Sequence, residues 1–125
     1  MNGKTILLAD DDELLASLLN FRLKKAGYEV HHVLDGKEVK KYLSHSMPDI
    51  IVSDIMMPYF SGIELINHVR KELSSQTPII IISSAGNEEN VLSAFELGAN
   101  DFISKPVSPS ELLVRIAREV NKTNI

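Results

Sequence analysis

The chain has 125 residues, a length typical of one domain with a single hydrophobic core. Hydrophobic residues make up 44% of the sequence and charged residues 24%, as in ordinary globular proteins. The net charge of −4 gives no support to nucleic-acid binding, and the lack of cysteine excludes disulfides and thiolate metal sites. The first apolar run is too short for a secretory signal or a membrane span, so a cytoplasmic protein is expected.

The N-terminal part is predicted to contain two strand–helix units. Residues 4–9 form a strand buried on both faces, because its aliphatic residues are continuous rather than alternating. Residues 29–33 form the second strand, and residues 37–45 form a highly charged helix after the Asp35-Gly36 turn. The helix between these strands stops at Gly27, and its apolar residues are expected to lie mostly in the core: Leu14, Leu15, Leu18, Leu19 and Phe21.

The middle of the chain centres on the run Ile50 to Val52, which precedes Ser53 and Asp54. Residues 49–54 are predicted to form a buried central strand, bounded by turns at Pro48 and Pro58. Beyond the second turn, apolar residues at helical spacing mark a third helix: Ile63, Leu65, Ile66 and Val69.

The C-terminal part repeats the pattern twice more. Residues 78–82 form the most apolar strand, followed by a helix over 87–97 that stops at Gly98. Residues 101–104 form a short fifth strand. The last helix begins at Pro109, where Ser108 and Glu111 provide a capping box, and it carries Leu112, Leu113, Ile116 and Val120.

Strand and helix thus alternate five times along residues 1–125, without an internal repeat or a linker. Helical crossovers between buried strands favour parallel pairing and right-handed connections. The sequence therefore predicts one α/β domain, a doubly wound five-stranded parallel sheet with helices on both faces.

Four predicted strands end in polar residues whose side chains can react or bind a ligand. Because the carboxyl ends of parallel strands meet at one edge of a sheet, these side chains should converge. Two carboxylates about 4 Å apart repel by roughly 4 kcal/mol at an effective dielectric of about 20, so a compensating cation is expected. Oxygen ligands suit a hard ion such as Mg²⁺. The residues are Asp10 and Asp11 after the first strand, Asp54, Ser83 and Lys105.

A carboxylate, a metal, a hydroxyl and a lysine together suit phosphoryl transfer, with Asp54 becoming an acyl phosphate. Taken singly, each member has a simpler explanation. Aspartates before a helix are usually caps, and a lone Asp, Ser or Lys-Pro at a strand end usually belongs to a turn. The agreement of four separate strand ends favours the reactive site.

The same residues resemble the response-regulator receiver domain, from about Lys4 to Val120. The resemblance rests on Asp10-Asp11, Asp54 within Asp-Ile-Met-Met-Pro, Ser61-Gly62, Ser83, Gly98-Ala99 and Lys105-Pro106. It implies a flavodoxin-like fold with strand order 2-1-3-4-5, and a phosphorelay switch rather than an enzyme in the ordinary sense.

By this resemblance Asp54 is the phosphoacceptor, and Asp10, Asp11, Asp54 and the Met56 backbone carbonyl hold Mg²⁺, with Mn²⁺ as an alternative. Ser83 and Phe102 are the switch residues, although the family more commonly has threonine and tyrosine there. Lys105 binds the phosphoryl group and precedes a cis peptide to Pro106. Asp12 belongs to the start of the first helix and is excluded from the metal site.

The resemblance also implies the partners. A sensor histidine kinase or a phosphotransfer protein supplies the phosphoryl group, and the fourth helix, fifth strand and fifth helix signal to a downstream protein or a fused output domain. That surface also allows a phosphorylation-dependent dimer. Direct contact with nucleic acid or a membrane is not expected.

Three other functions stay open from the residues alone. An aspartyl phosphatase usually carries a second aspartate two residues after the nucleophile, where this chain has Met56. A flavin or nucleotide binder would need a phosphate-cradling loop in place of three aspartates. A receiver-like module that is never phosphorylated is disfavoured by the intact site. The four histidines are expected on the solvated surface: His31, His32, His45 and His68.

Overall fold

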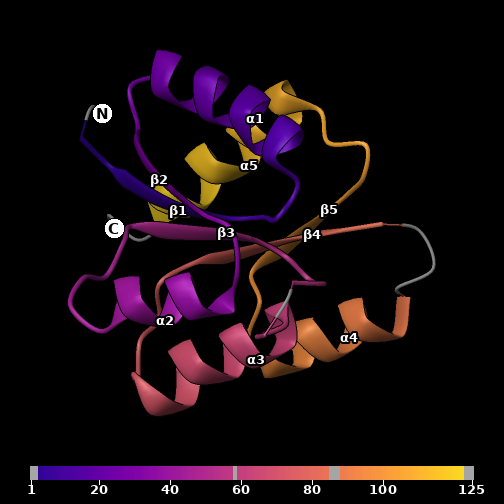
Figure 1. Ribbon diagram of the computed structural model, residues 1–125. Helices are drawn as coiled ribbons and strands as arrows, with labels where there is room; N and C mark the ends of the chain where they lie inside the picture. Colours follow the sequence, from indigo (N-terminus) through magenta and orange to yellow (C-terminus); the bar gives the residue numbers. More distant parts are fainter. Residues whose placement is uncertain (1–2, 58, 85–87, 123–125) are drawn as a thin grey trace.

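The computed structural model describes residues 3–57, 59–84 and 88–122 (Figure 1). Pro58 and Asn87, expected at a turn and at a helix start, lie outside the described residues. The elements follow the expected order: β1 (Thr5–Ala9), α1 (Glu13–Lys25), β2 (Glu29–Val33), α2 (Gly36–Leu43), β3 (Ile50–Asp54), α3 (Gly62–Asn67), the π-helical turn η1 (His68–Glu72), β4 (Ile79–Ser83), α4 (Glu88–Leu97), β5 (Asp101–Ser104) and α5 (Pro109–Lys122).

The five strands form one sheet in the order β2-β1-β3-β4-β5, and every neighbouring pair is parallel. Helices α1 and α5 cover one face, and α2, α3 and α4 cover the other (Figure 1). This is the doubly wound α/β fold predicted from the sequence, including the strand order implied by the family resemblance. None of the helices in the described part of the chain is long and apolar enough to cross a membrane.

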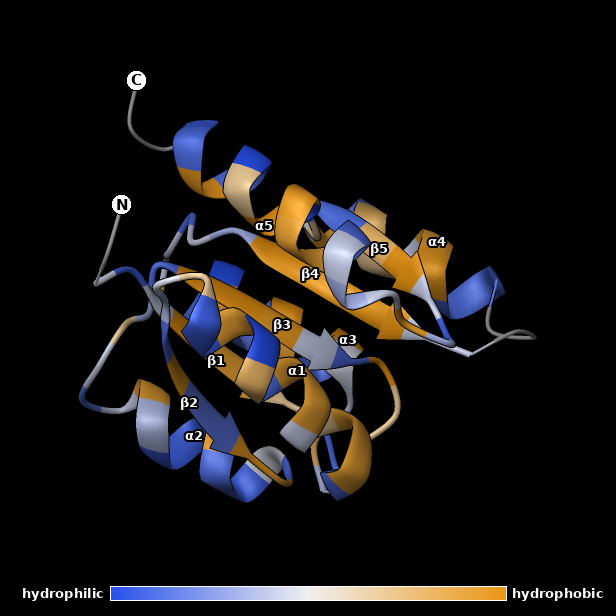
Figure 2. Cartoon of the chain, turned by 90° about the horizontal axis from the view of Figure 1, so that it is seen from above, coloured by the Kyte–Doolittle hydropathy of each residue, from blue (hydrophilic) through white to orange (hydrophobic). Residues whose placement is uncertain are grey.

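The core lies in two layers, one on each face of the sheet. Along β1, Leu7 belongs to the layer under α2 and α3, whereas Leu8 belongs to the layer under α1 and α5. The central strands therefore carry apolar side chains on both faces, which Figure 2 shows as hydrophobic colouring along β4 and along the first part of β3, before Ser53 and Asp54. Each buried leucine or isoleucine contributes about 1.5–3 kcal/mol, so these strands fix the sheet on which the polar strand ends sit.

Helix α1 departs from the prediction in its choice of buried face. Its buried residues are Ala16, Leu19 and Leu23, whereas Leu14 is 83% exposed and Phe21 64% exposed. Leu18 is exposed as well, so the expectation that Leu14, Leu18 and Phe21 lie mostly in the core was wrong. The helix carries two apolar stripes at the same spacing, and only one of them can face the sheet.

The third helix is longer and less regular than expected. After α3 the backbone passes into the π-helical turn η1, and Arg70 on that turn donates hydrogen bonds to the carbonyl oxygens of Gly98, Ser75 and Thr77. These bonds tie the end of the helix to the segments that enter β4 and β5. η1 is a single π turn of five residues, which is too short to show a period of its own in the apolar spacing.

Candidate functional site

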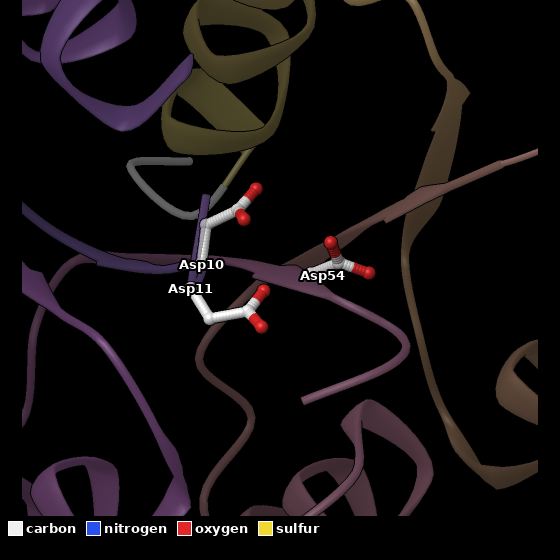
Figure 3. A group of neighbouring side chains, drawn as sticks. All are labelled: Asp10, Asp11 and Asp54. Carbon is white, nitrogen blue, oxygen red and sulfur yellow. The ribbon is translucent and has the colours of Figure 1, made fainter. Parts of the chain in front are cut away.

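The polar strand ends gather at the carboxyl edge of the sheet. Asp10 follows β1, Asp54 ends β3, Ser83 ends β4 and Lys105 follows β5. One carboxylate oxygen from each of Asp10, Asp11 and Asp54 lies within 4.8 Å of the others. Figure 3 shows the side chains of Asp10 and Asp11 extending towards the side on which Asp54 lies. The predicted convergence of the three acids is present in the structure.

Asp10 is the most deeply buried member of the group. Its Oδ1 accepts a hydrogen bond of 2.8 Å from the Asp12 backbone N–H, which tightens the turn between β1 and α1. Its Oδ2 is buried and has no hydrogen-bond partner among the described residues. Burial raises the pKa of the Asp10 carboxyl above its usual value. A buried carboxylate oxygen without a donor is costly unless a cation approaches it.

Asp12 performs a different task from its two neighbours. Its backbone is extended, and its Oδ1 accepts a hydrogen bond of 3.1 Å from the Leu15 N–H, so it caps the N-terminus of α1. The group of converging acids contains Asp10, Asp11 and Asp54. The Asp12 side chain is thus engaged in the helix cap, and its exclusion from the metal site stays a prediction.

Asp54 is held at both oxygens. Oδ1 accepts a hydrogen bond of 2.9 Å from the Met56 N–H, and Oδ2 accepts one of 2.6 Å from Lys105 Nζ. The same Nζ lies 3.9 Å from Asp10 Oδ2. Burial alone would lower the pKa of the Lys105 ammonium, but the hydrogen bond and the charges of Asp54 and Asp10 together raise it. The peptide between Lys105 and Pro106 is cis, as the resemblance implied.

The donor set fits a hard divalent cation. Three carboxylates face a single ammonium group in this space, so the site keeps an excess of negative charge. The unpartnered Asp10 Oδ2 adds a buried acceptor. Oxygen ligands of this kind, with water completing the shell, are what Mg²⁺ prefers in proteins. Asp10, Asp11 and Asp54 are therefore the residues that would hold the ion.

The loop after β3 is fixed against α2 by a close contact. Gly36, the first residue of α2, lies so near Phe60 that a Cβ built on it would be 1.7 Å from the Phe60 Cβ. Only glycine allows this approach. Lys40 on α2 also places its Nζ 4.7 Å from the centre of the Phe60 ring. These contacts hold the loop that carries Met56 beside Asp54.

The two expected switch residues, Ser83 and Phe102, have side-chain contacts outside the acidic group. Ser83 is buried, and its Oγ donates a hydrogen bond of 3.1 Å to the Ser84 carbonyl oxygen. Phe102 is half-buried on β5. Its ring lines a largely apolar cavity of 440 Å³ between α4 and β5, together with Ser84, Glu88, Val91, Leu92, Phe95 and Ser104.

The structure corrects the placement of two histidines. His31 and His45 are exposed as expected, but His32 and His68 are half-buried. His68 pairs with Glu72 and meets the Phe60 ring edge to face. His32 Nε2 lies 2.9 Å from the Asp10 backbone carbonyl oxygen. Strand alternation places His32 on the same face as Val30, and that spacing could have identified its inward position.

Comparison with known proteins supplies independent information on the whole chain. Residues 6–117 match the family model described as "Response regulator receiver domain". Among curated proteins, the chain is 36% identical over 124 residues to the phosphate regulon transcriptional regulatory protein PhoB of Pseudomonas aeruginosa, covering 98% of this chain and 54% of PhoB. It is 34% identical over 123 residues to the alkaline phosphatase synthesis transcriptional regulatory protein PhoP of Bacillus subtilis, covering 98% of this chain and 51% of PhoP. The chain thus spans about half the length of these relatives.

Solved structures agree with the sequence comparison. A putative response regulator from Chloroflexus aurantiacus superposes with a TM-score of 0.89 at 32% identity, covering 96% of this chain and 99% of the other. A receiver domain of the Francisella response regulator 1452 superposes with the same TM-score at 33% identity, covering 96% of this chain and 98% of the other.

Proposed function

The chain belongs to the response regulator receiver domain family, and from this premise we propose that Asp54 accepts a phosphoryl group from a phosphohistidine of a sensor kinase or a phosphotransfer protein. The observation that carries the proposal is the group of three carboxylates with Lys105 2.6 Å from Asp54. Receiver domains are signalling domains, so Asp54 is the group that becomes modified rather than a catalyst acting on a separate substrate.

The chemical step is a displacement at phosphorus. An oxygen of the Asp54 carboxylate forms a bond to phosphorus while the bond between phosphorus and the donor histidine nitrogen breaks, and that nitrogen keeps the electron pair. Lys105 is placed to offset the negative charge on the transferring oxygens. Mg²⁺ would neutralise the remaining charge when bound by Asp10, Asp11, Asp54 and the Met56 carbonyl; Mn²⁺ offers the same chemistry. Hydrolysis of the acyl phosphate returns the free carboxylate.

The switch we propose follows from the charge that phosphorylation adds, about 1.5 to 2 negative charges at neutral pH. Ser83 would exchange its hydrogen bond to the Ser84 carbonyl for one to a phosphoryl oxygen, drawing the segment after β4 inward. Phe102 borders the cavity between α4 and β5 and could rotate within it. The change would reach partners through α4, β5 and α5, either a downstream protein, a fused output domain or a second copy of the chain.

The relatives suggest the wider setting. PhoB and PhoP are named as transcriptional regulatory proteins, and this chain matches about half of each. We propose that residues 1–125 form a single receiver domain in the cytoplasm, and that any contact with nucleic acid is made by an output partner rather than by this domain.

The test is labelling with acetyl phosphate and Mg²⁺, followed by intact-protein mass spectrometry. Wild-type protein is expected to gain one phosphoryl group, and Asp54→Ala none. Asp12→Asn is the matched control, because Asp12 caps α1 and should not affect labelling beyond a small change. Labelling of Asp54→Ala at the wild-type level would refute the assignment.

A second variant tests the switch separately. Ser83→Ala should still be labelled, while the NMR shifts of α4 amides that accompany phosphorylation should shrink markedly. The reason is that the variant lacks the hydroxyl proposed to follow the phosphoryl group. An α4 response equal to that of the wild type would remove Ser83 from the switch and leave Asp54 untouched.

A further inference from the structure

His32 makes a contact that no role described so far requires. It lies on β2, the edge strand next to β1, and its Cα pairs in register with that of Leu8. Its ring lies on the α1 side of the sheet, where Val30 and Leu8 also pack. From there Nε2 comes within 2.9 Å of the Asp10 backbone carbonyl oxygen.

The chemistry of this contact fixes its direction. A carbonyl oxygen only accepts hydrogen bonds, so His32 Nε2 must be protonated and its N–H must be the hydrogen-bond donor. The distance of 2.9 Å is that of a well-formed N–H···O bond. The ring therefore holds the Nε2–H tautomer when it is neutral.

The bond lies where the regular β-sheet pairing ends. The Asp10 N–H still donates to the Val33 carbonyl across the sheet, at 3.1 Å. β2 ends at Val33, and the next N–H, of Leu34, donates to the Glu38 carboxylate at 2.8 Å instead. The Asp10 carbonyl has thus left the backbone ladder, and the side chain of His32 supplies its donor.

That carbonyl belongs to the peptide unit joining the two acids that follow β1. Its orientation sets the backbone torsions on both sides, and these determine the directions of the Asp10 and Asp11 side chains. The Asp10 carboxylate has a further restraint in the Asp12 N–H, whereas the exposed Asp11 carboxylate makes no hydrogen bond with the described residues. The peptide plane is therefore the main restraint on Asp11.

We propose that His32 is a positioning residue for the acidic group: by donating its Nε2 proton to the Asp10 carbonyl, it locks the Asp10–Asp11 peptide and keeps Asp11 aimed at the cation. It contacts neither the ion nor the phosphoryl group. Groups that orient metal ligands from behind typically affect affinity by tenfold or more when removed. The inference rests on the proposed magnesium site and adds to it a support from the edge of the sheet.

Two substitutions separate the hydrogen bond from the volume of the ring. His32→Phe keeps an aromatic ring of similar size and lacks the donor. His32→Gln lacks the ring and can present an amide N–H at a similar reach. His31→Phe is the matched control, because His31 is the adjacent exposed residue and contacts the Tyr42 ring in a tilted arrangement, with ring centres 4.7 Å apart.

The measurement is the Mg²⁺ dissociation constant of the unphosphorylated protein, obtained by NMR titration of the backbone amides near Asp11 and Asp54. We expect weakening of about tenfold for His32→Phe, within twofold of wild type for His32→Gln, and no change for His31→Phe. Wild-type affinity in His32→Phe would overturn the proposal. Equal weakening in His32→Gln and His32→Phe would also overturn it, because ring packing would then be the cause.

Two further results keep the test decisive. If His32→Phe does not fold, the long-range ¹H–¹⁵N spectrum of wild-type His32 decides, since a neutral ring protonated only at Nδ1 cannot donate from Nε2 and would overturn the proposal. If wild-type protein itself fails to bind Mg²⁺, the magnesium site proposed above is refuted. The two failures can be told apart. If the wild type binds Mg²⁺ and His32→Phe binds it equally well, only the role of His32 is refuted.

Discussion

Asp10 and Asp101 are both buried aspartates, one directly after β1 and the other at the start of β5, and their side chains have very different partners. Both oxygens of Asp101 are paired, Oδ1 with Arg115 at 2.7 Å and Oδ2 with Arg118 at 2.6 Å. Oδ1 also accepts the Phe102 N–H at 2.8 Å. Asp10, by contrast, has one oxygen on the Asp12 N–H and another without a hydrogen bond, with the Lys105 ammonium 3.9 Å away.

This difference in pairing distinguishes a charge with a structural role, Asp101, from a charge in the candidate functional site, Asp10. The hydrogen bond and the charge of Asp101 raise the pKa of Arg115, so the pair favours the charged form of the guanidinium. Burial raises the pKa of Asp10, so its charged form is held at a cost. The side chains of two arginines thus pair with Asp101, whereas Asp10 keeps an underpaired oxygen at the place where the proposed cation would bind.

The largest test of this comparison is the addition of Mg²⁺. An ion that binds only the folded state raises the free energy of unfolding by about 2.7 kcal/mol at one hundred times its dissociation constant. We expect that increase for wild type and for Asp101→Asn, because Asp101 lies outside the acidic group. Asp10→Asn and Asp11→Asn should gain much less. Urea unfolding with and without Mg²⁺ measures all four.

Equal gains in all four proteins would contradict the assignment of the ion to the acidic group. Ca²⁺ at the same concentration is a useful second cation, because a larger ion that prefers more ligands should stabilise this small donor set less than Mg²⁺.

The next effect in size is the loss, in metal-free protein, of the ion pairs that Asp101 makes with Arg115 and Arg118. Asp101→Asn should lower the free energy of unfolding by about 2 kcal/mol. The substitution removes the charge of the buried carboxylate and so weakens the two charge-assisted hydrogen bonds that this carboxylate accepts. Most of the loss belongs to the Arg115 side chain, which is 29% exposed. The Arg118 side chain is 54% exposed, and solvent screens its share.

Glu111→Gln is the control for Asp101→Asn. Glu111 also pairs with Arg115, at 2.8 Å, but its side chain is 45% exposed. Its loss should change stability by about 0.5 kcal/mol or less. A loss as large as that of Asp101→Asn would show that burial does not set the difference between the two pairs.

The sequence was sufficient for the features that depend on pattern. The run Ile50 to Val52 before Asp54 predicted a buried central strand, and parallel topology then brought the acids after β1 and β3 together. The glycine stops also follow from local chemistry, since Gly27 and Gly98 have φ of +101° and +119°. The pairing of both Asp101 oxygens with arginines was not predicted, although Arg115 and Arg118 lie in the predicted last helix.

The features that the sequence did not reveal depend on choices between equal patterns. Helix α1 offers two apolar stripes, and packing against the sheet selects the one with Leu19 rather than Leu14. The direction of the Ser83 hydroxyl towards the Ser84 carbonyl is a rotamer, which composition does not encode. His32 gains its partner because β2 ends one residue later, which leaves the Asp10 carbonyl open.

The smallest effect gives the sharpest contrast, because the same substitution should act with the opposite sign at Asp10. The pKa of Asp10 is raised in the folded protein above its unfolded value of about 3.8, so the fold binds that proton more tightly than the unfolded chain does. Stability from this group is therefore present below the unfolded pKa and is lost as pH rises through the folded pKa. At neutral pH Asp10→Asn removes a buried charge, and it should raise the free energy of unfolding of metal-free protein by about 1 kcal/mol.

Urea unfolding at several pH values tests the sign of this change in stability. The advantage of Asp10→Asn should shrink as pH falls through the folded pKa and should vanish below the unfolded pKa, where wild-type Asp10 is protonated in both states. A variant that is less stable than wild type at neutral pH would mean that Asp10, like Asp101, is already a fully compensated structural charge.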